Sequence, residues 1–235
     1  LRAAVTPKFY PKSGFIRRIA PSLFSAQVKD KPSDLYETDN AFSLQFILKR
    51  NANVSFRANY STEIFLGEKF KTSGVSVSGS SQLTKQLALS FSSRYGKTIR
   101  FSSDPFQGKG SDASASVTYQ PSEKLNANLN FRYSDLFRDS NSEKIFDVKI
   151  WRGRLTYQLN RFLFFRGIAE HNSFRKRLLT DFLASFTYIP GTVMHLGYGS
   201  LYEKNYFEND VLISRNRFIE TQRGVFAKAS YLWRL

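Results

Sequence analysis

The sequence has no cysteine and only two histidines, His171 and His195. Without cysteine the chain can form neither a disulfide nor a thiolate metal site, and two imidazoles are too few for a histidine-rich metal centre. We therefore expect no metal and no cofactor.

Acidic residues are also scarce, with 19 aspartates and glutamates against 35 lysines and arginines, which gives a formal net charge of +16. A charge of this sign favours anionic partners, whether nucleic acid, anionic lipid or small anions. The basic residues are spread along the chain, and no RNA-recognition, zinc-finger or helix-turn-helix signature is present. We do not expect a nucleic-acid partner.

Long apolar runs are missing as well. The longest stretch without a charge runs from Phe182 to Tyr202, but Pro190-Gly191 divides it into two strand-length halves, so it does not predict a transmembrane helix. The mean hydropathy of −0.37 still allows a membrane barrel, because strands that alternate lipid-facing and lumen-facing residues average to a polar composition.

What the sequence does contain is hydrophobic alternation with a period of two, the spacing that places successive strand residues on opposite faces. Between residues 125 and 134, leucine, alanine, phenylalanine and tyrosine alternate with asparagine, arginine and serine. The same pattern recurs at 42–48, 54–61, 75–80, 87–92, 113–120, 151–159, 182–188 and 225–235. The pattern predicts an all-β chain.

The connections between these strands alternate in length. Tight links are expected at 50–53, 83–85, 121–124, 159–161 and 190–192, and longer polar links at 30–39, 66–73, 96–110, 135–143, 172–177 and 202–220. Short periplasmic turns at one rim and longer extracellular loops at the other are typical of outer-membrane barrels.

Counting strands between these links predicts a transmembrane antiparallel β-barrel of about 12 strands, the first roughly Ile16–Lys29 and the last roughly Gly224–Leu235. An even count lets the last strand pair with the first, so that no strand edge meets lipid. Residues 1–15 are expected to be a tether or lead-in, and residues 16–235 the barrel. The alternative is a soluble basic β-sheet protein that binds anionic partners, because a β-sandwich alternates in the same way.

Segments in the C-terminal part of the chain resemble a known family. They are Leu155-Thr156-Tyr157-Gln158-Leu159-Asn160-Arg161, then Pro190-Gly191-Thr192 with Leu196-Gly197-Tyr198, and finally Arg223 to Arg234. The region resembles the C-terminal end of an uncharacterised family of bacterial surface proteins, in which a domain like carbohydrate-binding module family 9 precedes an outer-membrane β-barrel. The resemblance implies a location and a fold rather than an activity; the family members are much longer, and this chain lacks the module.

The C-terminus also resembles the assembly signal of outer-membrane barrels, an alternating apolar strand that contains aromatic residues. Tyr231 and Trp233 are expected to form an aromatic girdle at the periplasmic interface, where amphipathic rings are favoured. Leu235 stands where such strands usually end in phenylalanine.

Eight basic residues fall on the polar side of their predicted strands. They are Arg57, Arg94, Arg132, Arg152, Arg154, Arg166, Lys228 and Arg234. If that side faces the lumen, the excess of positive charge would make a pore anion-selective or would contact a plug. The alternative is that Glu170, Asp181, asparagines and backbone groups satisfy these side chains inside a filled barrel.

Enzyme chemistry is not expected. His195 is out of phase with Met194 and Leu196 and therefore points to the lumen, and a catalytic triad would need a distant serine that the sequence does not mark.

Basic residues also occur in the longer links. They are Lys69, Lys71, Lys97, Arg100, Lys109, Arg175, Lys176, Arg177, Arg215 and Arg217. These side chains would bind phosphates of outer-leaflet lipid, including lipopolysaccharide, or are simply solvated. The sequence thus predicts a non-enzymatic protein of the bacterial outer membrane. It would be either a pore for anionic solutes or the membrane anchor or scaffold of an assembly with other surface or periplasmic chains.

Overall fold

The computed structural model describes residues 1–12, 14–189, 191–208 and 211–232, and the side chains of 206–208 and 211–212 are not part of the description. Within these residues the chain forms fourteen strands and no helix, so no helix there is long and apolar enough to cross a membrane. The strands are β1 (Arg2–Val5), β2 (Ile16–Lys29), β3 (Tyr36–Leu48), β4 (Asn53–Phe65), β5 (Glu68–Lys71), β6 (Gly74–Gln82), β7 (Leu87–Arg100), β8 (Phe106–Ser122), β9 (Leu125–Arg138), β10 (Lys144–Gln158), β11 (Leu163–Asn172), β12 (Arg177–Ile189), β13 (Thr192–Glu208) and β14 (Val211–Ser230). The predicted all-β fold class is confirmed.

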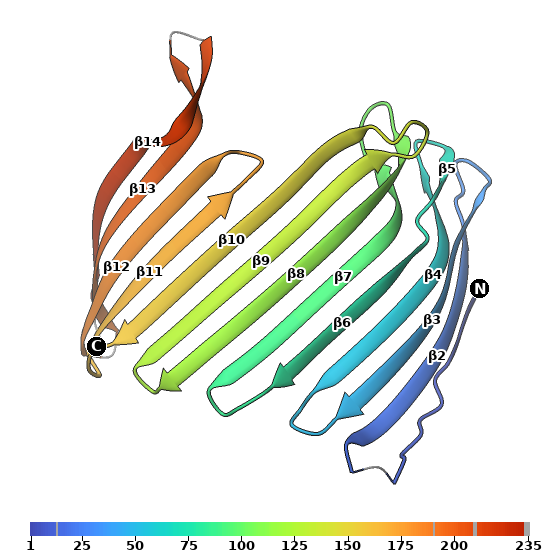
Figure 1. Cartoon of the computed structure of the whole chain (residues 1–235), viewed down its shortest axis with the longest axis horizontal. Helices are drawn as coiled ribbons and strands as arrows, with labels where there is room; N and C mark the ends of the chain where they lie inside the picture. The colour runs from blue at the N-terminus through green and yellow to red at the C-terminus, as the bar shows by residue number, and fades with distance from the viewer. Residues whose placement is uncertain (13, 190, 209–210, 233–235) are drawn as a thin grey trace. The chain divides into compact units, whose positions relative to one another are not determined.

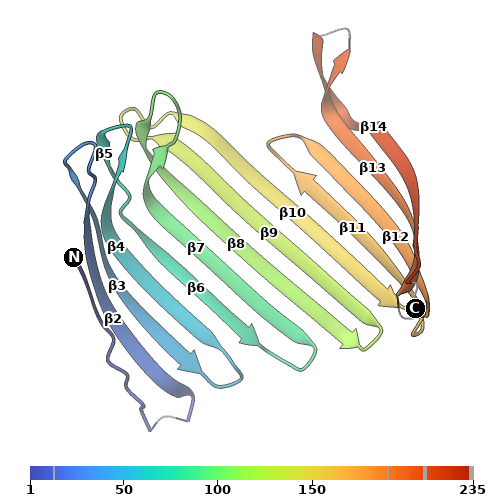
Figure 2. The same ribbon diagram turned by 180° about the vertical axis from the view of Figure 1, so that it is seen from behind.

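The strands form an antiparallel meander. Each long strand pairs with the next long strand along the chain, and β5 lies off this path as a hairpin on β4 (Figure 1). Figure 2 shows the same succession of hairpins from behind. The β4–β5 turn uses Leu66 and Gly67, both with positive φ (51° and 80°), the backbone conformation that two-residue hairpin turns require.

The chain divides into two compact units. Unit 1 comprises Leu1–Leu83, Ala88–Ala115 and Tyr133–Asp147, and unit 2 comprises Thr84–Leu87, Ser116–Arg132 and Val148–Leu235. Unit 1 therefore contains all of β1 to β6, and unit 2 contains all of β11 to β14. Nothing in the sequence pattern marks this division.

Two strands are additional to the predicted set. Both β1 and β5 have 4 residues, too few to show alternation. β1 pairs with β2 from Arg2↔Ala26 to Val5↔Leu23, so part of the segment predicted as a tether or lead-in belongs to the sheet. The other twelve strands match the predicted number, and β2 has the predicted bounds.

The links at one rim are shorter than predicted, because the strands continue into them. The link expected at 96–110 is reduced to 101–105, and the link expected at 202–220 is mostly a hairpin whose pairing runs to Glu208↔Val211. The last strand therefore spans Val211–Ser230 instead of roughly Gly224–Leu235. Polar side chains pair across this extension: Ser214 Oγ donates to Asn205 Oδ1 at 2.8 Å. In Figure 1 the β13–β14 hairpin projects past the ends of β11 and β12.

In unit 1 the strand register separates an apolar face from a polar face. One row across β3, β4, β6 and β7 contains Phe42, Ala58, Val75 and Tyr95, and the adjacent row contains Ser43, Arg57, Ser76 and Arg94. Residues paired across strands share a face, and neighbours along a strand point to opposite faces. The first row therefore belongs to the apolar face and the second to the polar face.

Unit 2 repeats this separation. A row on its apolar face contains Tyr157, Phe165, Ala184, Leu196 and Ala227, and a row on its polar face contains Gln158, Phe164, Ser185, His195 and Lys228. Apolar side chains interrupt both polar faces: Phe164 and Leu183 in unit 2, and Phe24 and Ile47 in unit 1.

Few apolar side chains are buried. Among the described residues the buried hydrophobic ones are Ala20, Ala41, Phe70, Ile99, Leu136 and Leu183. By contrast, the exposed fraction is 63% for Leu23 and 56% for Val75 on the apolar face of unit 1, and 72% for Val225 on that of unit 2. A soluble domain of this length buries most of its apolar surface. The two apolar faces are therefore suited to contact with another apolar phase.

Candidate functional site

The predicted basic residues lie on the polar faces wherever the structure describes them. They are Arg57 and Arg94 in unit 1, and Arg132, Arg152, Arg154, Arg166 and Lys228 in unit 2. Arg132 is assigned through its neighbour Phe131, since neighbours along a strand point to opposite faces. The Phe131 ring centroid lies 4.3 Å from that of Trp151, which is on the apolar face. Arg234 and Trp233 lie outside the described residues. That these cations face a lumen stays a prediction.

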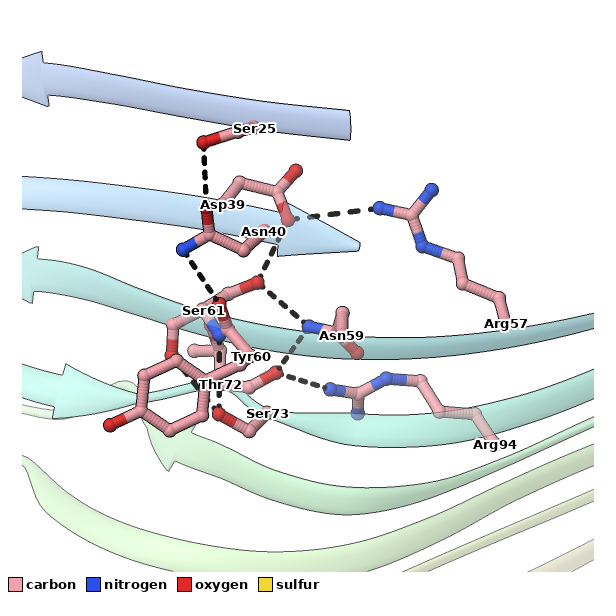
Figure 3. Close-up of polar contacts among 10 residues, drawn as sticks. All are labelled: Ser25, Asp39, Asn40, Arg57, Asn59, Tyr60, Ser61, Thr72, Ser73 and Arg94. Atoms are coloured by element: carbon pink, nitrogen blue, oxygen red, sulfur yellow. Dashed lines mark hydrogen bonds and ion pairs between the residues drawn. The ribbon is translucent and has the colours of Figure 1, made fainter. Parts of the chain in front are cut away.

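On the polar face of unit 1, Arg57 belongs to a hydrogen-bonded network (Figure 3). Arg57 Nη2 lies 3.7 Å from Asp39 Oδ1, which also accepts a hydrogen bond from Ser61 Oγ at 2.8 Å. Asn59 Nδ2 donates to the same hydroxyl oxygen at 2.8 Å and to the Thr72 carbonyl oxygen at 3.0 Å. The network ties β3 and β4 to the link before β6 and holds the Asp39 carboxylate in place.

Arg94 binds backbone instead of a carboxylate. Its Nη2 donates to the Thr72 carbonyl at 3.0 Å and to the Lys97 carbonyl at 3.3 Å. These neutral acceptors orient the guanidinium without cancelling its charge. Asp39 compensates the positive charge of Arg57 only in part, because the Arg57 side chain is 45% exposed and ion pairs of this kind are weak in water.

A row of short hydroxyl side chains runs across this polar face. Ser55, Ser78 and Ser92 form one row, which Ser114 continues through a hydrogen bond of 2.8 Å to the Ser92 hydroxyl. Serine hydroxyls both donate and accept hydrogen bonds and occupy little volume. The surface around the two arginines is therefore polar and unobstructed by large side chains.

The polar face of unit 2 carries five of the predicted cations, Arg132, Arg152, Arg154, Arg166 and Lys228. Arg152 pairs with Glu170, with Nη1 3.4 Å from Oε2. Arg154 lies opposite Ile168, and Arg166 lies between Thr156 and Leu183. Among the described side chains, no carboxylate forms an ion pair with either of these two arginines.

Four buried polar atoms of this face have no hydrogen-bond partner among the described residues. They are Arg166 Nε, Asp181 Oδ1, Ser185 Oγ and His195 Nδ1. They lie on three adjacent strands, β11, β12 and β13, with Ser185 directly opposite His195. Each such atom costs about 1–3 kcal/mol unless water or a ligand satisfies it. Water would satisfy all four, whereas an anion would accept a hydrogen bond from Arg166 Nε but would leave the Asp181 carboxylate oxygen unsatisfied.

Ser185 and His195 form a pair whose residue types resemble part of a catalytic site, and sequence reasoning did not find it. His195 is on the polar side, as its phase predicted. Ser185, however, is 1% exposed, and no hydrogen bond links its hydroxyl to the imidazole. A nucleophilic serine must reach its substrate and be activated by a base, so this pair does not support hydrolytic chemistry.

The other predicted functional features are separate from this face. His171 lies on the apolar face, opposite Trp151. Tyr231 follows the end of β14 and is 67% exposed, as an interfacial ring would be, although the girdle with Trp233 stays a prediction. Within the described part of the chain no group of histidine, aspartate and glutamate side chains could hold a metal ion.

No protein-family model matches the chain, and no curated protein sequence does. Among solved structures, the chain is similar to the NanC porin, with 16% sequence identity, a TM-score of 0.39, and coverage of 84% of this chain and 93% of that chain. It is also similar to the CymD monoaromatic hydrocarbon channel, with 8% identity, a TM-score of 0.35, and coverage of 86% of this chain and 78% of that chain. At these scores neither similarity identifies a solute or an activity for this chain, and the family resemblance of its C-terminal region stays a prediction.

Proposed function

We propose that this protein is a non-enzymatic β-barrel of the bacterial outer membrane whose basic polar face lines a pore for anionic solutes. The observation that carries the proposal is the separation of faces in both units. One face is apolar and exposed, and the other is polar and rich in arginine.

The membrane location is supported by the exposed apolar faces. Transferring such surface from water to an apolar phase is favourable by about 25 cal/mol per Å², and contiguous apolar surface of this extent is unusual on a soluble monomer. Twelve of the strands have 9 to 20 residues, and a tilted strand of about 9–11 residues spans the hydrocarbon core. These features disfavour the soluble β-sheet alternative.

The anion preference is supported by the charges on the polar faces. Arg94, Arg154 and Arg166 have no carboxylate ion-pair partner among the described side chains, whereas Arg57 and Arg152 each have one. A water-filled path along such a face attracts anions and repels cations.

A second candidate function, a membrane anchor or scaffold for other surface or periplasmic chains, is favoured by the long β13–β14 hairpin. This hairpin extends past the neighbouring strands and would carry partner contacts (Figure 1). Outer-membrane lipid, including lipopolysaccharide, is the partner expected in either case.

Recording from single molecules in planar bilayers tests the proposal. We expect a stable conductance with an anion-selective reversal potential under a salt gradient, and a fall in anion selectivity in the double variant Arg152→Ala/Arg154→Ala. The matched control is Lys85→Gln/Lys124→Gln, which removes two exposed cations from short links. No conductance from protein that is folded and inserted would favour the anchor.

Recovery in the membrane fractions tests the location separately. We expect the protein in the outer-membrane fraction, with a heat-dependent shift on a denaturing gel. A protein that stays in solution without detergent would contradict the membrane location.

A further inference from the structure

A second concentration of positive charge lies away from the polar faces, in a pocket of unit 2 at the rim that holds the β11–β12 link and the β13–β14 hairpin. The pocket has a volume of about 430 Å³ and is lined by His171, Ser173, Lys176, Lys204, Ser214, Arg215, Asn216 and Phe218. These residues come from three separate segments of the sequence, so the sequence pattern alone did not join them.

Backbone and short polar contacts fix the positions of the lining residues. Ser173 Oγ accepts a hydrogen bond from Lys149 N at 2.8 Å, and Ser173 N donates to the Lys149 carbonyl at 2.9 Å. Lys204 N, within β13, donates to the Lys176 carbonyl at 3.0 Å, which holds Lys204 beside the residue that precedes β12. The pocket is therefore part of the sheet and does not depend on a long loop.

The Phe218 ring contacts two of the lining side chains, Lys204 and His171. The Nζ of Lys204 lies over the Phe218 ring, 5.0 Å from its centroid, and the His171 ring meets Phe218 edge to face at 6.0 Å. A cation held against an aromatic face keeps its charge while giving up part of its hydration. The Phe218 ring thus holds the Lys204 ammonium at the pocket.

The chemistry of the lining selects a compact, multiply charged anion. Lys176 and Lys204 supply cationic donors, Arg215 adds a third positive charge, and Asn216 supplies a neutral donor, while none of the described lining residues is acidic. Lysine and arginine are the usual partners of phosphate oxygens, and charge-assisted hydrogen bonds to them are strong. A phosphate group fits this donor set.

The position of the pocket indicates which kind of molecule carries that phosphate. His171, in the pocket wall, shares the apolar face with Trp151 and Leu178, its partners on β10 and β12. The pocket therefore begins where the apolar face ends. In a membrane protein the phosphates of lipid head groups lie at this boundary, with acyl chains along the apolar face.

We propose that this pocket binds the phosphate group of an anionic lipid. The proposal rests on the membrane location proposed above but not on conduction, so a protein that forms no pore could still bind the lipid. The fold offers an acyl-chain path beside Trp151 and Leu178, which a free phosphate would not use.

Native mass spectrometry of the full chain in zwitterionic detergent tests the proposal, with phosphatidic acid as the probe and phosphatidylcholine as the neutral reference. Removing two cations in Lys176→Gln/Lys204→Gln should weaken phosphatidic acid binding roughly thirtyfold, since each basic residue near an anionic lipid contributes about 1 kcal/mol. The variant Lys204→Arg should retain binding, because it keeps the charge.

The control Lys85→Gln/Lys124→Gln makes the same change of net charge within unit 2, at the links β6–β7 and β8–β9. It should bind phosphatidic acid like the unmodified chain. Equal losses in both double variants would overturn the site in favour of a general charge effect, and no loss in Lys176→Gln/Lys204→Gln would overturn it outright. Glycerol phosphate, a soluble probe without acyl chains, should compete only weakly; competition as strong as that of phosphatidic acid would overturn the lipid assignment.

Discussion

Both units separate an apolar face from a polar face, but the hydrogen bonding of the polar groups differs between them. In unit 1 the polar face includes rows of short hydroxyls, and Ser61, Asn59 and Asp39 satisfy one another around Arg57. In unit 2 the corresponding face holds more arginine, and four of its buried polar atoms have no hydrogen-bond partner among the described residues, compared with Arg18 Nε on the polar face of unit 1. The comparison teaches that hydrogen bonds within the fold fix the polar groups around Arg57 in unit 1, whereas the polar face of unit 2 buries several polar groups that still need a partner.

Close backbone contact in unit 1 gives the largest expected difference in stability. Gly96 lies opposite Gly74, and a Cβ added at Gly96 would press on the Ser73 carbonyl oxygen and lie 2.5 Å from the Gly74 Cα. Gly96→Ala should lower the free energy of unfolding by about 1–3 kcal/mol, because the backbone must move. Gly153→Ala in unit 2 has open space and should change it little. Equilibrium unfolding in urea from lipid vesicles measures both, and equal effects would remove this contrast.

Two buried serines, one in each unit, are expected to differ in what their hydroxyls contribute to the free energy of unfolding, by a smaller amount. Ser61 is 7% exposed and its hydroxyl has two partners, whereas Ser185 is 1% exposed and its hydroxyl has no partner among the described residues. Ser61→Ala should cost about 1–2 kcal/mol, since it leaves Asp39 and Asn59 each short of a hydrogen bond. Ser185→Ala should be neutral within about 0.5 kcal/mol. A large loss in Ser185→Ala would show that its hydroxyl is satisfied in the folded protein, and the proposed difference between the units would fail.

Ion selectivity gives the smallest expected effect. Arg154→Gln should lower the anion-to-cation permeability ratio roughly twofold at low salt, where screening is weak. The neutral double variant Arg57→Gln/Asp39→Asn removes an ion pair without changing the net charge and should leave the ratio unchanged. Reversal potentials under a salt gradient report both, and a change of ratio in the double variant alone would place the selective region in unit 1.

Period-two alternation predicted the fold and the phase of the polar face because each depends only on neighbours within a strand. β2 appears with its expected bounds, and Arg57, Arg94 and Arg154 lie on the expected side. The predicted start of the last strand, Gly224, was wrong, since β14 begins at Val211. Irregularities at Leu201/Tyr202 and Glu203/Asn205 shift its register against β13 and interrupt the alternation. β5 was missed because four residues cannot show a period.

Contacts between strands were not predictable. Ser185 lies opposite His195 only because the β12–β13 register, which includes an irregularity between Thr187 and Ile189, places them together. The phosphate pocket likewise depends on the alignment of Lys204 with Lys176 and on the position of Phe218. Hydrophobic alternation specifies the face of each side chain, but the register decides which side chains meet.

The most direct test of the central claim, an apolar face toward lipid and a basic polar face toward water, uses the absence of cysteine from the chain. Single cysteines placed in turn at Val54, Ser55, Phe56, Arg57 and Ala58 on β4 can be treated with a membrane-impermeant thiol reagent in lipid vesicles. We predict labelling at Ser55 and Arg57 and protection at Val54, Phe56 and Ala58, with the pattern lost after denaturation. Equal labelling at all five positions would contradict the claim.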